Sequence, residues 1–231
     1  MSASEAFLAL NARKGKRFGA YPDVEISSQH AATLEEVSEL MTTVREEIYK
    51  RGLKSSNKYT PGKPGDLERN TDADRELARL YQLPPGDGVE RAFSASAHNC
   101  QELVNISAEL LRAMGFYVHE HAFPGDHVVV VCSRTRLPEL PEDWKDWKAD
   151  DIFVCDAWSN TACAAADYRE RFLGKMAKWS GRGKRVWELR EDDKDPESPD
   201  HWIDPLTPRW LESLFKPRQE PDEADSQPAD T

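Results

Sequence analysis

The sequence predicts an α+β fold, in which an antiparallel sheet packs against helices. Residues 98–115 have the apolar spacing of an amphipathic helix, and residues 116–134 have the pattern of a β-hairpin. A third apolar run, at residues 151–158, predicts another strand, and a second helical pattern covers residues 164–179. An order of helix, three strands and helix is typical of a sheet covered by helices rather than of a parallel α/β fold.

Residues 1–93 are predicted to form a helical and irregular N-terminal segment without recognisable chemistry. A short helix is expected at residues 3–12, and residues 33–52 form the clearest helical pattern, with Thr33 and Glu36 matching a capping box and Gly52 at the end. Residues 54–69 are rich in Pro, Gly, Lys and Ser and predict an exposed loop, and residues 72–83 predict a second helix. The apolar stripe of the first long helix consists of Leu34, Val37, Leu40, Met41, Val44 and Ile48.

Residues 94–190 are predicted to form the core of the protein. A helix should run from Cys100 to about Met114 and end at Gly115, and the turn at residues 124–126 should join the two strands of the hairpin. Residues 184–189 suggest a last strand. Residues 191–215 are predicted to be an extension with a short helix capped by Thr207, and residues 216–231 have the composition of a disordered tail.

Composition and charge limit the classes of function. The net charge of −11 over 231 residues argues against a nucleic-acid partner, since phosphates need a basic surface. No apolar run reaches the roughly 20 residues of a membrane span, and the N-terminus lacks the pattern of a Sec signal peptide. We therefore expect a cytoplasmic protein. The four cysteines, which follow no zinc-binding spacing, are expected to be reduced thiols.

Three polar residues stand at the ends of predicted elements and together suggest an activated thiol. Cys100 opens a helix, where unpaired backbone N–H groups favour the thiolate form of a cysteine. His127 opens the second strand of the hairpin, and Asp156 closes the third strand. A nucleophilic cysteine needs an imidazole base, and a carboxylate can hold that imidazole in one tautomer. The sequence therefore predicts Cys100, His127 and Asp156 as a catalytic triad.

Residues beside the triad are candidates for contact with a substrate. The N–H groups at the start of a helix can hold an oxyanion, and the flanking amides of Asn99 and Gln101 could add a donor. Trp158 is expected to cover the edge of the site or to pack in the core. Neither a metal nor an organic cofactor is expected.

The segments HNCQELVNISAELLRAMGFYVHEHAFPGDHVVVVCS and DDIFVCDAW resemble parts of bacterial papain-like or transglutaminase-like cysteine enzymes. Those chains often have Asn-Cys-Gly-Glu at the start of a helix, Asp-His before a hydrophobic strand, and a strand ending in Asp-Pro-Trp. The resemblance covers about residues 94–160. Gln101 stands where the family usually has Gly, and Ala157 stands where it usually has Pro.

The resemblance implies a papain-like or transglutaminase-like core and a reaction at amide bonds of a protein substrate. Proteases, glutamine or asparagine deamidases and transglutaminases all occur in this group, and many are effectors or toxins that act in virulence. The resemblance therefore implies, as an alternative to the cytoplasm, delivery to a host or target cell by a specialised secretion system. The resemblance implies Cys100 as nucleophile, His127 as base and Asp156 as orienting acid, and it does not choose among the three reactions. Residues 1–93 are interpreted as a cap, a partner-binding lobe or a chaperone-binding segment. The resemblance implies a chaperone or an immunity protein as a partner of the protein.

Two other interpretations stay open on the sequence alone. If the three residues are dispersed, the chain is a non-catalytic interaction module whose binding surface surrounds Trp144 and Trp147. If His119, His121 and His127 meet, they could hold a metal ion. The basic segment at residues 182–185 could contact an acidic partner, although a solvated turn is the simpler interpretation.

Overall fold

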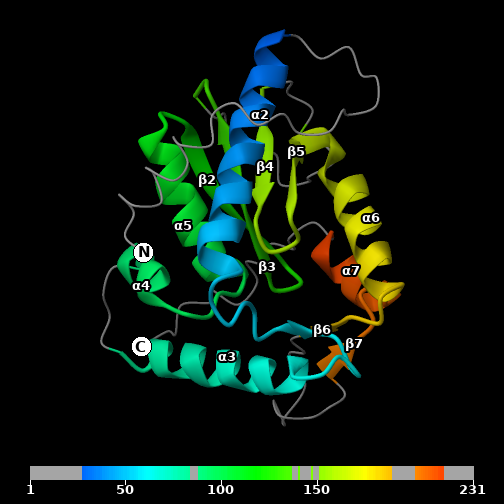
Figure 1. The fold of residues 1–231 in the computed structure, drawn as a ribbon. Helices are drawn as coiled ribbons and strands as arrows, with labels where there is room; N and C mark the ends of the chain where they lie inside the picture. The colour runs from blue at the N-terminus through cyan, green and yellow to red at the C-terminus, as the bar shows by residue number, and fades with distance from the viewer. Residues whose placement is uncertain are drawn as a thin grey trace, which may run out of the picture.

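A four-stranded antiparallel sheet, with strand order β2-β3-β4-β5, forms the centre of the protein. The structure is a computed structural model and describes residues 28–83, 88–136, 140, 147, 151–188 and 201–215. Helices α2 and α5 lie side by side over the sheet, and α6 runs along its β5 edge (Figure 1). This arrangement confirms the predicted α+β class. The bounds are β2 (Tyr117–Phe123), β3 (His127–Ser133), β4 (Phe153–Asp156), β5 (Thr161–Ala164), α2 (Ser28–Thr43), α5 (Cys100–Ala113) and α6 (Tyr168–Ser180).

The register of the sheet brings the start of β3 next to the end of β4. Val130 pairs with Cys155, and because the strands are antiparallel, residues before Val130 lie beside residues after Cys155. The tight turn between β2 and β3 places Phe123 opposite His127. The predicted hairpin is therefore confirmed, and its geometry carries His127 to the same edge of the sheet as Asp156.

A second, smaller sheet corrects the prediction of an exposed loop at residues 54–69. Strands β1 (Lys58–Tyr59), β6 (Arg185–Trp187) and β7 (Trp202–Ile203) pair in the order β1-β6-β7. Within the predicted loop, the side chains of Ser55, Ser56 and Lys58 are buried. Long-range hydrogen bonds stabilise this segment, since Arg69 donates to the backbone carbonyls of Leu53, Ser55 and Lys58. Such contacts leave no periodic signal in the sequence.

Three helix boundaries also differ from the predicted ones. Helix α2 begins at Ser28, so Thr33 lies inside it and its hydroxyl donates to the carbonyl of Gln29 at 2.9 Å instead of capping the helix. Helix α3 (Asp66–Tyr81) begins six residues before the predicted start at residue 72. The predicted helix at residues 164–179 begins only at Tyr168, because Thr161–Ala164 pairs with β4 as strand β5.

One hydrophobic cluster packs helix α2 and its continuation, from the N-terminal segment at residues 1–93, against the sheet. It contains the whole apolar stripe of α2 and its continuation η1 (Val44–Tyr49), together with apolar residues of α5, β3, β4 and α6. Helix α4 (Gly88–Ser94) and the C-terminal helix α7 (Pro208–Leu214), which Thr207 precedes as predicted, add to it. The predicted helix at residues 3–12, Trp144 and the tail at residues 216–231 lie outside the described residues. Among the described helices, none is both long and apolar enough for a membrane span.

Candidate functional site

Cys100 is the first residue of α5, as the sequence predicts, and its side chain is 8% exposed. The preceding residue, Asn99, has extended backbone geometry, and its N–H donates to Glu102 Oε2 at 2.9 Å. The second oxygen of Glu102 accepts a hydrogen bond from Tyr81 at 2.6 Å. Glu102 is therefore a capping residue that fixes the start of the helix and, with it, the position of the thiol.

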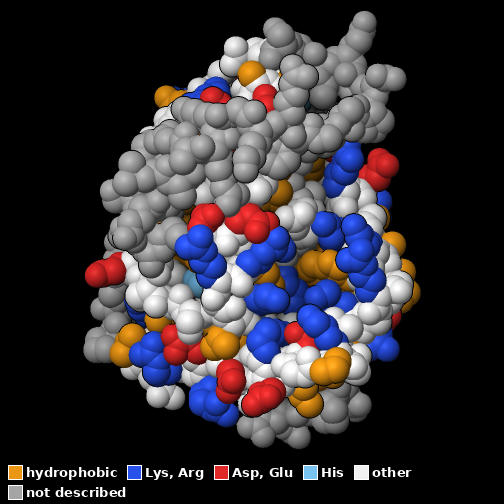
Figure 2. All heavy atoms as spheres, in the orientation of Figure 1, with side chains coloured by type: hydrophobic (Ala, Val, Ile, Leu, Met, Phe, Trp, Pro, Cys, Tyr) orange, Lys and Arg blue, Asp and Glu red, His pale blue; other side chains and the backbone are white. Residues whose placement is uncertain are grey.

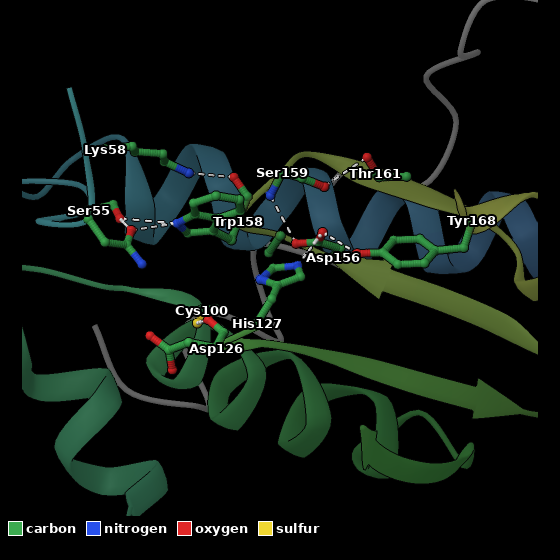
Figure 3. A network of polar contacts seen from close by, with 12 residues as sticks. Ser55, Lys58, Cys100, Asp126, His127, Asp156, Trp158, Ser159, Thr161 and Tyr168 are labelled. Carbon is green, nitrogen blue, oxygen red and sulfur yellow. Dashed lines mark hydrogen bonds and ion pairs between the residues drawn. The ribbon is translucent and has the colours of Figure 1, made fainter. Parts of the chain in front are cut away.

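His127 lies between Cys100 and Asp156 (Figure 3). Its Nε2 is 3.0 Å from Asp156 Oδ2. The Cys100 thiol lies near enough to favour the charged ring, while its Sγ donates to the backbone carbonyl of Asp126 at 4.0 Å. Since Nε2 faces the carboxylate, Nδ1 is the ring nitrogen available to the thiol. Burial disfavours the charged imidazole, but the attraction of Asp156 and the hydrogen bonds to Asp156 and Cys100 outweigh it, so the pKa of His127 is raised to about 9.

Asp156 is 1% exposed and accepts three hydrogen bonds. Besides His127, the hydroxyl of Tyr168 donates to Oδ2 at 2.9 Å and the backbone N–H of Ser159 donates to Oδ1 at 2.9 Å. Burial raises the pKa of this carboxyl group, but the attraction of His127 and the hydrogen bonds lower it by more, so the net shift is downward. The carboxylate is therefore charged and fixed in orientation.

Replacement of Tyr168 by phenylalanine is expected to lower the free energy of unfolding by about 2 kcal/mol. The change removes a hydrogen bond to a buried carboxylate and leaves its acceptor with one partner fewer. Urea denaturation measures the loss. Tyr117→Phe is the matched control, since Tyr117 is 53% exposed, and its effect should stay within about 0.5 kcal/mol. Equal effects of the two changes would contradict the structural role of the Tyr168 hydroxyl.

Trp158 packs beside the imidazole and is held by residues 55–57, which the sequence predicted to lie in an exposed loop away from the site. The two ring centroids are 5.0 Å apart, and the indole N–H donates to Asn57 Oδ1 at 2.8 Å and to Ser55 Oγ at 3.2 Å. The Ser55 hydroxyl also lies 2.8 Å from Asn99 Oδ1. Residues 55–57 therefore connect the cap of the Cys100 helix with the aromatic ring beside His127.

Two basic side chains hold the turn that follows Asp156. The guanidinium of Arg45 donates to the carbonyls of Ala157 and Trp158, and Lys58 Nζ donates to the Trp158 carbonyl at 2.6 Å. Both residues belong to the half of the chain in which the sequence revealed no chemistry. No local motif marks them, because their partners lie about 100 residues further along the chain.

The other predicted substrate contacts have structural partners. The Gln101 amide donates to Asn105 Oδ1 at 2.9 Å along the helix surface, and the Asn99 amide donates to Ser56 Oγ at 3.1 Å. Their role toward an oxyanion stays a prediction. Trp147, a candidate for the binding surface of an interaction module, is 1% exposed. The described residues contain no group of three His, Cys, Asp or Glu side chains placed to hold a metal ion, so His119, His121 and His127 do not form such a group.

All four cysteines are free, and among the described residues Cys100 is the cysteine that lies beside a histidine ring, that of His127. Cys132, Cys155 and Cys163 are buried, and burial raises the pKa of each of these three thiols, that of Cys155 to about 12. A thiol, an imidazole and a carboxylate in series can move a proton and generate a nucleophile. No protein-family model, curated protein or solved structure matches this chain, so the chemistry of the cluster rests on its own geometry.

Proposed function

We propose that the protein is a cysteine-dependent hydrolase or acyltransferase that acts on amide bonds of a protein substrate. The observation that carries the proposal is the position of His127, which hydrogen-bonds Asp156 at 3.0 Å through Nε2 and faces Cys100 on its other side. Burial of an imidazole and a carboxylate costs desolvation free energy. Such costly pairs are found at functional sites, where they activate a third group. The resemblance to papain-like and transglutaminase-like enzymes points in the same direction.

The first half of the reaction forms a thioester. The Cys100 thiolate attacks the amide carbonyl carbon, a C–S bond forms, and the electron pair of the carbonyl moves to its oxygen. Backbone N–H groups at the start of α5 are the candidate donors to that oxyanion. When the intermediate collapses, the C–N bond breaks and the His127 imidazolium gives its proton to the leaving amine.

The second half resolves the thioester and restores the thiol. Neutral His127 takes a proton from water, or from a second amine, as that nucleophile attacks the thioester carbon. The C–S bond then breaks and Cys100 leaves as the thiolate beside the imidazolium. Water gives a peptide fragment or a deamidated side chain, and an amine gives a crosslink. Asp156 keeps the imidazole oriented throughout and stabilises its charged form.

Alkylation of Cys100 by iodoacetamide at pH 6 tests the activated thiol. If His127 activates this thiol as proposed, Cys100 should react faster than glutathione at this pH, and tandem mass spectrometry identifies the modified residue. Cys132, Cys155 and Cys163 should stay unmodified, but burial alone explains that, so glutathione is the decisive reference. Alkylation of Cys100 slower than that of glutathione would count against the proposal.

The reaction class follows from intact mass spectrometry of candidate substrate proteins. A gain of about 1 Da identifies deamidation, two fragments identify proteolysis, and a sum of two masses less ammonia identifies transamidation. Cys100→Ala should abolish each of these products. Products formed equally by Cys100→Ala would contradict the assigned nucleophile.

A further inference from the structure

Six basic side chains gather on one side of a protein whose net charge is −11. Figure 2 shows Lys and Arg side chains around a hollow with hydrophobic side chains inside it, over the region between α2 and α6. They come from η1, β1, α6 and the segment after α6. We call this group the basic hollow: Arg45, Lys58, Lys175, Lys178, Arg182 and Lys184.

None of these six side chains forms an ion pair with a described residue. Burial lowers the pKa of Lys58 well below its ordinary value, and repulsion by Arg45 and Lys184 lowers it further. Burial, then repulsion by Arg45 and Lys178, likewise lowers the pKa of Lys175. Asp156 offsets part of this repulsion at Lys58 and Lys175 without pairing with either side chain. A further anion placed among the basic side chains would relieve the remaining repulsion.

The basic hollow has an aromatic component that connects it with the candidate site. Lys58 Nζ lies 4.1 Å from the centroid of the Trp158 ring and 4.8 Å from that of Trp179, and Lys184 Nζ lies 5.3 Å from Trp179. Trp158 in turn is 5.0 Å from the His127 ring. The hollow thus lies directly beside the imidazole, separated from it by a single side chain.

We propose that the basic hollow binds an acidic segment, rich in Asp and Glu, of the protein substrate and so brings a neighbouring amide to Cys100. This proposal rests on the proposed function and specifies its substrate class. Carboxylate groups form charge-assisted hydrogen bonds with individual lysine and arginine side chains. A short acidic peptide segment is small enough to make these contacts within the basic hollow. A nucleic acid would extend beyond the hollow, where the strongly negative remainder of the protein repels it.

Fluorescence anisotropy with a fluorescein-labelled peptide containing six consecutive glutamates tests the proposal. The full-length Cys100→Ala protein should bind this peptide, and binding should weaken as NaCl rises from about 50 to about 500 mM. Lys175→Glu and Lys178→Glu should each weaken binding about fivefold. Arg136→Glu is the matched control: it makes the same charge change at an exposed residue beyond the far end of β3 and should leave binding within about twofold.

Several outcomes would overturn the proposal. These are an absence of peptide binding, equal weakening by Arg136→Glu, or tighter binding of a single-stranded oligonucleotide with the same charge. Alkylation of the wild-type protein separates this test from that of the proposed function. Fast alkylation of Cys100 without peptide binding refutes the basic hollow as a substrate site alone. Peptide binding without fast alkylation refutes the proposed chemistry and leaves an acidic-peptide binding protein.

Discussion

Replacement of His127 by alanine is expected to slow alkylation of Cys100 by iodoacetamide about 100-fold at pH 6. Iodoacetamide reacts with the thiolate, and a positive charge beside a thiol stabilises that form, so loss of the charge should slow the reaction. In the wild-type protein the His127 imidazolium pairs with Asp156 and lies beside Cys100, and the alanine variant lacks it. Stopped reactions at several times, followed by intact mass measurement, give the two rates.

The pH dependence of the alkylation rates shows whether the charge of His127 activates the thiol. The pKa of His127 is raised to about 9, so the imidazolium is present below that pH and is lost as the pH rises through it. The ratio of wild-type to variant rates should therefore be large at pH 6 and should fall toward 1 near pH 9, where an unpaired thiol ionises by itself. A ratio independent of pH would indicate that His127 acts on access to the thiol and not on its charge.

Two further variants keep this experiment interpretable. His119→Ala removes an exposed histidine on the neighbouring strand β2 and should leave the alkylation rate unchanged. His127→Gln fills part of the space that alanine leaves empty, so it should keep the fold better while lacking the positive charge. Far-UV circular dichroism and the thermal midpoint identify any variant that has lost the fold. A fast reaction in a folded His127→Gln protein would contradict the proposed pair.

Gly52→Ala is expected to lower the free energy of unfolding by about 3 kcal/mol, the largest effect on stability among the changes considered. A Cβ atom at this position would lie 2.1 Å from the backbone oxygen of Ser96 and 3.1 Å from its carbonyl carbon. Backbone atoms cannot move aside as a flexible side chain can, so the two segments must separate. The same segments are joined by hydrogen bonds from Leu53 N to Ser96 O at 2.6 Å and from His98 N to Lys54 O at 2.8 Å.

The matched control for Gly52 is Gly174 in helix α6. A Cβ atom there meets no other atom within 4 Å, and alanine favours a helix more than glycine does. Gly174→Ala should therefore leave stability unchanged or raise it by about 0.5–1 kcal/mol. Chemical denaturation measures both variants. A loss at position 52 no larger than about 1 kcal/mol would mean that the close approach of residues 52 and 96 is relaxed in solution.

The residues of the candidate site were predictable because each stands at the end of a strongly patterned element. The apolar periodicity fixed α5, β3 and β4, and chain reversal at the Pro-Gly-Asp turn made β2 and β3 neighbours. Antiparallel register then brought His127 to Asp156. The choice of Cys100 as the proposed nucleophile depended on where α5 begins. In the structure, the capping residues Asn99 and Glu102 set this boundary.

The loop at residues 55–58 and strand β5 were not predictable from local pattern. Ser55 and Lys58 are buried and Asn57 is half-buried, and all three hydrogen-bond to Asn99 or Trp158, which are distant in the sequence. Composition alone favours exposure for such polar residues. Strand β5 is rich in alanine, which prefers helices, and it is extended because it pairs with β4.

The contacts of residues 55–57 determine how much of the chain must be synthesised before the candidate site can form. The hydrogen bond between Asn57 and Trp158 joins residues 101 positions apart, and the pair of His127 and Asp156 joins residues 29 positions apart. A chain that has been synthesised only as far as residue 150 already contains Cys100 but lacks both the carboxylate and the indole ring. Its thiol would then behave as an ordinary one. The reactivity proposed for Cys100 is thus a property of the completed fold and not of the thiol alone.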